Sequence, residues 1–578
     1  MLWNGVNGTL DSCIFINNTA SSGGGALLWS GNNGTLTDSF FINNTAKWGG
    51  AIRWDGANGN IICSIFIGNN ANLYEGGSIS LHGANCNITN STFINNIAKG
   101  NGGGVYCNAI NIHLSGSNFI NNAGTYGGGI YWAGEGRDGI LTNCNFTGNV
   151  ASANGGSICW DGNKGYLTGC TFSANTANNG GSVCWWSNFG TIKDSTFSDN
   201  AANNNGGAVY WTGASSSMSN CNFNSNNAIK GNNVYWVWTL EDFLNKYTQI
   251  NDYDYIYIQN GVGTPNSTIV LNKKGITISS EGNAIFDAKG GNLHFEVTGD
   301  NILIEKITFR NFNFTTAGGA IQWYGNNGVL KNCNFINNTA KYGGAIQWSG
   351  PNGTVTDSTF TDNIATINGG GIDWGGINGI ISGSNFINNT SYNVGGGLHW
   401  YNANGSLTGS TFTNNKANNL GGGVFWNSVN GGLSYSNFTN NKANSGGAIY
   451  WGGDSINGIL ITSIFKDNTA NYSGGAVYYT VTTSMTNCSF INSKSTNSNG
   501  IYARSNLNIN NGNGIIYVFI NGTLSGISIM VLNNETYYYP PNSNINFWED
   551  FFISFVVVCF LFFAYFVLFT AKKIIAAN

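Results

Sequence analysis

The side chains that could perform acid–base chemistry in this chain are few and dispersed. Its 578 residues include 26 acidic residues and 4 histidines. Hydrolysis of a glycosidic bond needs two carboxylates roughly 5–9.5 Å apart, and elimination typically needs acids that hold calcium beside a basic residue. Asp38, Asp194 and Asp357 share one repeat position where other repeats carry Asn or Gly, which is typical of solvated turns. The histidines lie in different parts of the chain: His82, His113, His294 and His399. We therefore predict that the protein is not an enzyme.

The cysteines and basic residues also lack the patterns that bind metals or nucleic acids. The 12 cysteines form neither CxxC pairs nor the Cys/His spacing of a zinc site. The net charge is -4, and no run of Lys or Arg lies outside the C-terminus. A surface that follows nucleic-acid phosphates needs such a run. The sequence thus predicts no metal, no cofactor and no nucleic-acid partner.

A repeat of about 26 residues positions these side chains. Each unit resembles GGAIQWSGPNGTVTDSTFTDNIA, residues 343–365, in which short alternating apolar stretches are separated by Gly and Asn. This pattern is typical of strands, and the many glycines would weaken a helix by about 1 kcal/mol each. We predict a right-handed parallel β-helix with three short strands in each coil, a solenoid in which every repeat forms one turn.

Stacked coils bring identical side chains into columns roughly 4.8 Å apart along the axis. One column is the Phe of each unit, and another is the Asn three residues after it. Stacked amides can hydrogen-bond from coil to coil and satisfy a buried turn. We assign this structural role to Asn18, Asn44, Asn69, Asn96, Asn122, Asn338, Asn363, Asn389 and Asn415.

The Ile-x-Trp segment of each unit gives two further columns. The Trp shares the parity of the Ile, which favours an interior or corner position over an external stripe that binds sugars. The residue between them should face outward, and it varies from unit to unit, which suits recognition. Strand propensity with ladder stacking is the alternative explanation. The candidate binding residues in this column are Tyr106, Tyr131, Tyr210, Tyr235, Gln322, Gln347, His399, Phe425 and Tyr450.

Two covalent modifications follow from the same alignment. Cys159 and Cys184 occupy the outward column in adjacent coils, and we hypothesise a disulfide between them, with Cys144 and Cys170 as a second pair. Asn-x-Ser/Thr sites would be glycosylated on an external protein in a host that has the machinery. The candidates are Asn33, Asn43, Asn145, Asn337, Asn352 and Asn437.

The period fails between about Val234 and Thr308, which divides the chain. We predict a first β-helix over residues 1–236 and a second over 237–510. A short capping helix near 239–249 is indicated by the Thr239 and Asp242 capping box. Met1 opens in the middle of a repeat, so we expect further residues before it in the natural product.

The C-terminal part has a different composition. Residues 511–547 are β-prone and polar, which suits a stalk, and residues 551–569 are apolar and uncharged over a length that spans a bilayer as a helix. Lys572 and Lys573 follow this segment. By the positive-inside rule, 570–578 is a cytoplasmic tail and the solenoid lies outside the cell.

The GGAI motifs at Gly49–Ile52 and Gly343–Ile346, with the FxxN motifs at Phe335–Asn338 and Phe412–Asn415, resemble those of chlamydial polymorphic outer-membrane proteins. The Asn-rich units are similar to the adhesin-like proteins of methanogenic archaea. The resemblance covers nearly the whole predicted ectodomain and implies a surface β-helix that acts in attachment. The chain departs from the chlamydial pattern by ending in one hydrophobic helix, and from the archaeal pattern by lacking an N-terminal signal.

These observations favour a membrane-anchored, cell-surface adhesin-like scaffold. Its expected partners are glycans or proteins of other cells or of a matrix, with the membrane contacted through the C-terminal helix. A polysaccharide-active enzyme of similar fold would require acids and bases converging in one groove. A structural cell-envelope protein would require a featureless exterior and lateral self-association.

Overall fold

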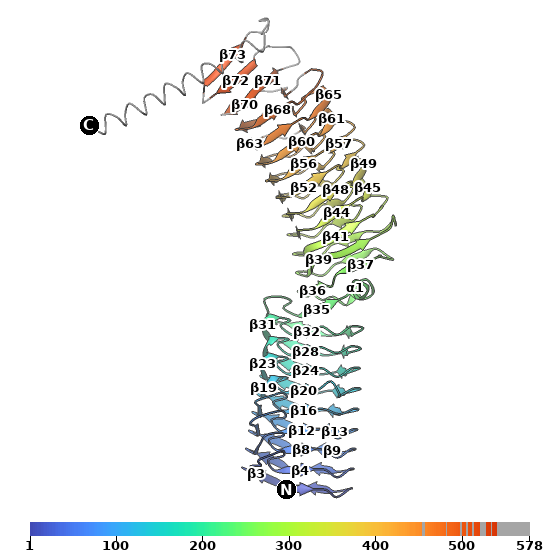
Figure 1. Ribbon diagram of the computed structural model, residues 1–578, viewed down its shortest axis with the longest axis vertical. Coiled ribbons are helices and arrows are strands. Elements are labelled where there is room, and N and C mark those ends of the chain that lie inside the picture. Colours follow the sequence, from blue (N-terminus) through green and yellow to red (C-terminus); the bar gives the residue numbers. More distant parts are fainter. Residues whose placement is uncertain are drawn as a thin grey trace, which may run out of the picture.

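The computed structural model is an all-β parallel solenoid of about 19 turns with about 26 residues in each (Figure 1). It describes residues 1–453, 457–480, 483–497 and 500–503, and the later segments 507–510, 514–520, 528–532 and 535–539. The predicted membrane helix at 551–569 and the tail at 570–578 lie outside the described residues, as does part of the predicted stalk. Among the described residues, no helix has both the length and the hydropathy needed to cross a bilayer.

Each complete coil contains four short strands, one more than the sequence pattern predicts. In one coil these are β46 (Ile346–Trp348), β47 (Thr354–Thr356), β48 (Thr359–Thr361) and β49 (Ile364–Asn368). A residue with left-handed backbone follows each strand: Asn352 (φ 55), Asp357 (φ 51), Asp362 (φ 56) and Gly369 (φ 66). Asn, Asp and Gly adopt this conformation at the lowest cost. The abundance of these residues therefore reflects the number of corners in each coil.

The Trp column lies in the interior, which decides between the positions that the sequence left open. Trp323, Trp348 and Trp374 are fully buried, and their rings stack with centroids 4.3 and 4.8 Å apart. Each indole covers a glycine in the loop that follows its own strand. A Cβ on Gly353 would lie 2.2 Å from the Trp348 Nε1 atom, so this turn requires glycine.

Apart from Asn18, which is exposed in the first coil, the predicted Asn column is also interior, and its side-chain amides are hydrogen-bonded from coil to coil. Asn389 Nδ2 donates to the Phe360 carbonyl at 2.9 Å and to Asn415 Oδ1 at 2.9 Å. Its Oδ1 accepts from the backbone N–H and the Nδ2 of Asn363 at 3.1 and 2.9 Å. Two donated and two accepted bonds use the whole capacity of an amide. The same arrangement recurs along the column, so its buried amides stay paired from coil to coil.

The Ile-x-Trp strands form one parallel sheet in each half of the solenoid. In the first half this sheet contains β4 (Leu27–Trp29), β8 (Ile52–Trp54), β12 (Ile79–Leu81), β16 (Val105–Cys107), β20 (Ile130–Trp132), β24 (Ile158–Trp160), β28 (Val183–Trp185), β32 (Val209–Trp211) and β35 (Val234–Trp238). In the second half it contains β38 (Ile269–Leu271), β40 (Phe295–Val297), β42 (Ile321–Trp323), β46, β50 (Ile372–Trp374), β54 (Leu398–Trp400), β58 (Val424–Trp426) and β62 (Ile449–Trp451).

These two sheets do not continue into each other across the junction. The first continues through β36 (Tyr255–Ile258), β39 (Thr277–Asp287) and β41 (Leu303–Arg310) into β43 (Val329–Lys331) and β44 (Asn334–Ile336). Trp236 thus pairs in register with Ile256, and the column continues through Ile278 and Ile304 to Leu330. The second Ile-x-Trp sheet begins separately at β38. The outward columns of the two halves therefore lie on different sides of the solenoid.

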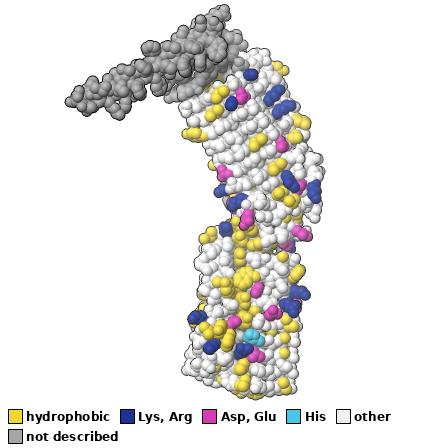
Figure 2. Space-filling view, in the orientation of Figure 1, with side chains coloured by type: hydrophobic (Ala, Val, Ile, Leu, Met, Phe, Trp, Pro, Cys, Tyr) yellow, Lys and Arg dark blue, Asp and Glu magenta, His cyan; other side chains and the backbone are white. Residues whose placement is uncertain are grey.

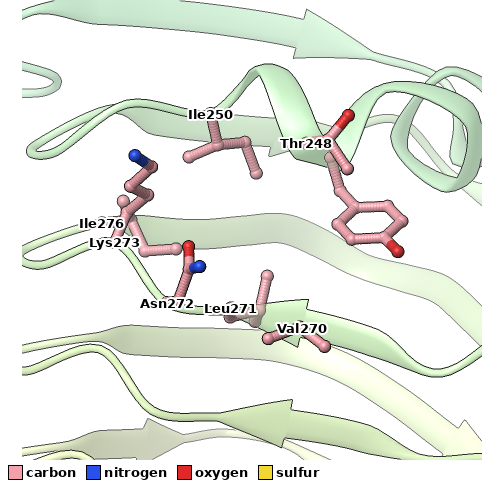
Figure 3. A pocket seen from close by; sticks show the side chains of 8 residues that line it. Thr248, Ile250, Val270, Leu271, Asn272, Lys273 and Ile276 are labelled. Carbon is pink, nitrogen blue, oxygen red and sulfur yellow. The ribbon is translucent and has the colours of Figure 1, made fainter.

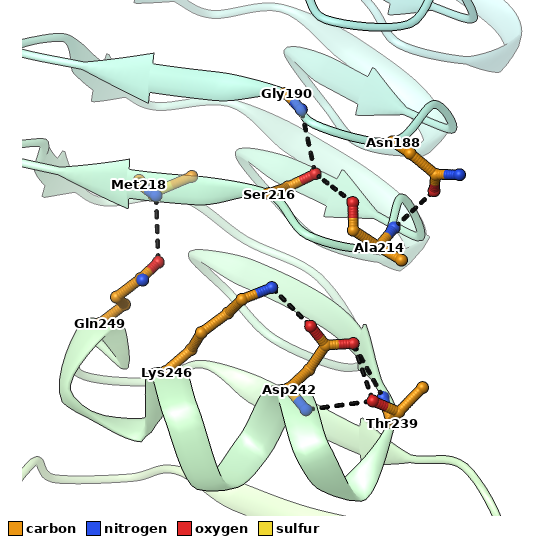
Figure 4. Close-up of polar contacts among 9 residues, drawn as sticks. All are labelled: Asn188, Gly190, Ala214, Ser216, Met218, Thr239, Asp242, Lys246 and Gln249. Carbon is orange, nitrogen blue, oxygen red and sulfur yellow. Dashed lines mark hydrogen bonds and ion pairs between the residues drawn. The ribbon is translucent and has the colours of Figure 1, made fainter.

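A short helix lies at this junction (Figure 4). Helix α1 (Leu240–Lys246) has Thr239 as its N-cap, and Thr239 and Asp242 form a capping box. Lys246 Nζ contacts Asp242 Oδ1 at 2.5 Å. A 3-10 turn, η1 (Tyr247–Gln249), follows, and Gln249 Oε1 accepts the backbone N–H of Met218 at 3.1 Å. The Gln249 side chain thus pairs a backbone donor in the last coil of the first half.

Candidate ligand-binding face

The outward residue of each Ile-x-Trp strand is flanked by two further columns. One contains the residue before the paired glycines, and the other contains the residue after the Trp. In the coil of β46 these three are Tyr342, Gln347 and Ser349. Gly343 and Gly344 add no side chain between the first two columns, and a Cβ on Gly344 would meet a backbone oxygen at 2.2 Å. We call these three columns together the binding face.

The predicted outward residues occupy the central column of this face, although neighbouring side chains cover much of their surface. Tyr235 and His399 are buried, each 9% exposed. The other seven are half-buried: Tyr106, Tyr131, Tyr210, Gln322, Gln347, Phe425 and Tyr450. Rings on adjacent coils pair with centroids 5.8 Å apart for Tyr106 and Tyr131 and 5.3 Å apart for Phe425 and Tyr450. The column presents partly covered ring edges and faces rather than a freely exposed aromatic surface.

Aromatic side chains from the flanking columns enlarge this face in the first half. The Tyr126 ring lies 6.4 Å from Tyr131 and makes an edge contact with Trp186 at 5.3 Å. Figure 2 shows hydrophobic side chains gathered along this half, whereas much of the remaining visible surface carries neither hydrophobic nor charged side chains. Sequence reasoning missed Tyr126 and Trp186. Their fixed positions before the paired glycines and after the Trp are the signal that could have found them.

The two outward cysteines of this half are inaccessible. Cys159 and Cys184 are in register on neighbouring strands, between Tyr131 and Tyr210, and both are fully buried. The Trp186 indole starts two residues after Cys184 and contacts Tyr126 two coils away, and we infer that it covers both cysteines. Burial raises the pKa of the Cys159 thiol well above its usual value.

The structure carries Cys159 and Cys184 as free thiols, and likewise Cys144 and Cys170, and a disulfide in either pair stays a hypothesis. Cys159 and Cys184 face each other in register on neighbouring strands, a Cα spacing that a disulfide permits. Peptide mass spectrometry with and without reductant would test both pairs.

Burial governs the ionisation of the tyrosines on this face. Burial, followed by the charge of Glu75, raises the pKa of Tyr106 to about 12. Burial also raises the pKa of Tyr210. These phenols remain neutral hydrogen-bonding groups at physiological pH.

A polar cluster lies beside Tyr106 at the N-terminal end of the face. Ser80 Oγ lies 2.9 Å from His82 Nε2, and burial, followed by the charge of Arg53, lowers the pKa of that imidazole. Ser80 is fully buried, so its hydroxyl is not accessible to a substrate as a nucleophile. The Glu75 Oε2 atom is buried without a hydrogen-bond partner.

The second half carries a cavity of about 310 Å³ in its binding face. The cavity spans successive coils, with side chains from all three columns. Its lining includes Tyr342, Gln347, Asn368, Asp373, His399 and Tyr401. His399 Nδ1 lies 2.5 Å from Asp373 Oδ1, and both side chains are almost completely buried. The predicted residues Gln347 and His399 thus meet in one site, together with Asp373.

Tyr401 forms one wall of this cavity. Its ring stacks against His399 with centroids 5.1 Å apart. A Cβ on Gly375 would lie 2.2 Å from the Tyr401 hydroxyl, so the phenol occupies space that only glycine leaves free. Burial, followed by the charge of Asp373, raises the pKa of Tyr401, whereas a hydrogen bond with Gln347 lowers it.

A second cavity of about 310 Å³ lies at the junction, between η1 and β38 (Figure 3). Lys273, Asn272 and Val270 line one side, and Thr248 and Ile250 line the other. The hydroxyl of Tyr247, which also lines it, already donates to the Thr268 carbonyl at 3.3 Å. This cavity thus lacks the paired acid and imidazole found beside Gln347.

The predicted glycosylation sites are all exposed. They lie at turns or on outward strand positions: Asn33, Asn43, Asn145, Asn337, Asn352 and Asn437. Asn352 Nδ2 donates to Asn327 Oδ1 at 3.0 Å within an outer amide ladder. Glycosylation of such a residue would replace one of these ladder hydrogen bonds.

The Chlamydia polymorphic membrane protein repeat matches five segments of the chain, residues 12–28, 90–108, 194–210, 435–450 and 462–480. Each segment contains an FxxN motif, which confirms the resemblance to the chlamydial repeats. No curated protein matches the chain significantly in sequence.

Solved structures of low similarity include polysaccharide lyases and an adhesin. A variant of AlyGC, a PL6 family alginate lyase, has a TM-score of 0.24 at 9% identity, over 88% of this chain and 97% of that one. A PL6 family polysaccharide lyase from Pseudopedobacter saltans has a TM-score of 0.20 at 10% identity, over 58% and 80%. PfbA, a surface adhesin of Streptococcus pneumoniae, has a TM-score of 0.15 at 11% identity, over 81% and 91%. Similarities at this level do not distinguish between functions.

Proposed function

We propose that the chain is a right-handed β-helical, adhesin-like scaffold at the cell surface that binds glycans or proteins through its binding face. The observation that carries this proposal is the contrast between core and face. The interior columns repeat Trp, Phe and Asn from coil to coil, while the outward column changes between Tyr, Gln, Asp, His and Phe. A constant core that supports a variable, ring-rich face suits recognition.

Attachment to a membrane through residues 551–569 completes the proposal. The apolar composition of this segment and Lys572 and Lys573 after it support a single-pass anchor with the solenoid outside. Protease treatment of intact cells should remove the solenoid and leave a short membrane-bound fragment. Protection of the solenoid in intact cells would contradict this topology.

We further propose that the protein is a binding protein and not an enzyme. Two observations support this proposal: the Ser80 hydroxyl is buried, and the acid and imidazole that meet in the binding face, Asp373 and His399, are bonded to each other and almost completely buried. Incubation of the full chain with alginate, pectate and neutral polysaccharides should release neither reducing ends nor unsaturated sugars. Release of either product would reverse the assignment.

Adhesion assays on the full chain test the main proposal. Wild-type protein on beads should bind glycan arrays or cells, and Tyr131→Ala should reduce binding because it removes a ring from the centre of the face. Tyr166→Ala is the matched control, since Tyr166 is 38% exposed on another sheet of the same half. Equal binding by both variants would overturn the role of the face.

One observation favours lateral self-association as a second function. Ile14, Ile16 and Phe40 are 66%, 50% and 40% exposed on β3 (Ile14–Ile16) and β6 (Phe40–Ile42). Ile16 begins an in-register column with Ile42, Ile67, Ile94 and Ile120. The last four of these isoleucines are half-buried, so the column is a partly exposed apolar stripe, and contiguous apolar patches mark contact surfaces. Sedimentation of Ile16→Ser against wild type would show whether this stripe joins copies of the chain.

A further inference from the structure

The cavity beside Asp373 has the size of a small-ligand site. Its volume of about 310 Å³ falls at the lower end of the range of roughly 300–1,000 Å³ for such pockets. Side chains of three successive coils, those of Gln347, Asp373 and His399, contribute to it. A site of this size holds a single ring rather than a folded partner.

The polar groups of the cavity are fixed in position. The contact with Asp373 engages Nδ1 of His399, which leaves Nε2 as the ring nitrogen available to a ligand. Gln347 Nε2 donates to Ser349 Oγ at 2.6 Å. An amide, a carboxylate, an imidazole and a phenol therefore converge on a small volume, and these groups both donate and accept hydrogen bonds.

Aromatic rings supply the apolar part of the site. Tyr342, from the column before the paired glycines, and Tyr401, from the column after the Trp, both line the cavity. Aromatic rings bury apolar surface while their hydroxyls reach polar partners. A ligand with an apolar ring face and a rim of hydroxyl groups matches this combination.

The charges of the cavity determine which sugars fit. Asp373 is 5% exposed, its only basic neighbour in the lining is the imidazole of His399, and none of the residues that line the cavity is Lys or Arg. Lys341 Nζ lies 5.6 Å from the centroid of the Tyr342 ring, but this side chain is exposed and screened by solvent. A carboxylate on the ligand would approach the buried Asp373 carboxylate, and like charges in a partly desolvated site repel.

We propose that this cavity binds one uncharged sugar ring and discriminates against uronic acids. The inference rests on the proposed binding function and specifies its ligand class at this site. The Asp373 carboxylate accepts hydrogen bonds from ring hydroxyls, and the Gln347 amide donates to them. Tyr342 and Tyr401 contact the ring face. Gly375 contributes by leaving room for the Tyr401 hydroxyl.

The test measures ligand binding by the full chain, purified in a detergent without a sugar headgroup. The probes are the methyl glycosides of glucose, galactose and mannose, compared with glucuronate and galacturonate, by saturation-transfer NMR and calorimetry. At least one neutral glycoside should bind, and both uronates should bind roughly tenfold more weakly. Tighter binding of a uronate would overturn the charge argument.

Two variants localise the binding to the cavity. Gly375→Ala should displace Tyr401 and lower the affinity for the neutral sugar roughly tenfold. Asp373→Asn should reduce the difference in affinity between neutral sugars and uronates. Gly432→Ala is the matched control, because a Cβ there meets nothing within 4 Å. Unchanged circular dichroism and melting temperature would show that each variant is folded.

The outcomes separate this inference from the proposed function. If wild type binds sugars and the two variants bind equally well, the cavity assignment fails while the binding function stands. If no sugar binds but the protein still adheres to cells, the sugar site fails and a protein ligand remains. Loss of both sugar binding and adhesion would overturn both.

Discussion

Asp254 Oδ2 accepts a hydrogen bond from the indole nitrogen of Trp236 at 3.0 Å, at the coil where the first Trp column ends. The same carboxylate accepts the backbone N–H groups of Val234 at 3.1 Å and Asn251 at 2.9 Å. It is 1% exposed. One buried acid thus joins β35 to the turn that follows η1, where the sheet of the first half continues into a different sheet of the second.

This carboxyl should make stability depend on pH. Burial raises the pKa of Asp254 to about 7, although hydrogen bonds from Asn251, Trp236 and Val234 lower it. The pKa of Asp254 in the folded protein lies above the unfolded value of about 3.9. The stabilisation of the fold by the protonated carboxyl is therefore complete below about pH 4 and is lost as pH rises through about 7. The full difference is on the order of 4 kcal/mol. Urea unfolding between pH 4 and 8 should show this decline.

The variant Asp254→Asn provides the control for this effect. An amide does not titrate, so the decline between pH 4 and 7 should become shallower. Its NH₂ group would also face a backbone or indole donor, which should lower the free energy of unfolding at pH 4. Identical pH profiles for wild type and variant would show that Asp254 is not the titrating group.

The interior amide column should be sensitive to a single truncation. Asn389→Ala would leave the Phe360 carbonyl and two Asn363 donors without their partners, and each such buried group costs roughly 1–3 kcal/mol. The exposed Asn378, at φ 55, is the matched control, because Asn378→Gly keeps its turn conformation. Urea denaturation should show a large decrease in the free energy of unfolding for Asn389→Ala and a small change for Asn378→Gly. Comparable losses would mean that the column contributes no more than an outer turn.

The glycine that packs against the Trp348 indole, Gly353, should tolerate no added methyl group. Gly353→Ala would place a Cβ 2.2 Å from the Trp348 Nε1 atom, and overpacking of this kind typically costs about 1–3 kcal/mol. Gly432→Ala adds the same methyl group in open space and should be neutral. Thermal unfolding and near-ultraviolet circular dichroism of the Trp stack would compare the two. A neutral Gly353→Ala would indicate that the stack shifts freely.

Repeat periodicity predicted the columns because stacking converts sequence alignment into spatial alignment. Asn389 and Phe360 are placed correctly by spacing alone, and so are Asp373 and His399 on successive coils. The number of strands in a coil was underestimated because corners at residues such as Asp357 depend on left-handed backbone rather than on hydrophobic pattern.

Two other features could be found only in the structure. The transfer of the Trp236 column to Ile256 occurs where the period is broken, so no alignment extends across it. The position of Tyr401 over Gly375 depends on the side-chain conformation and on space in the preceding coil. Neither leaves a periodic trace in the sequence.

Trp186 should protect the outward thiols from chemical modification. From its contact with Tyr126 we infer that the indole covers Cys159 and Cys184, which are both fully buried. Burial raises the pKa of Cys159, so its thiolate, the reactive form, is scarce at neutral pH. Trp186→Ala should therefore accelerate alkylation of these two cysteines by iodoacetamide, measured by peptide mass spectrometry under native conditions.

The exposed Cys63 and the buried interior Cys333 act as internal references for this measurement. Alkylation of Cys63 should be fast in both proteins, and alkylation of Cys333 should stay slow because the core remains closed. Phe189→Ala removes an aromatic ring that is 57% exposed in the same coil and should leave Cys159 protected. If Cys159 reacts equally in wild type and Trp186→Ala, the indole does not cover it, and its burial must come from the neighbouring coils alone.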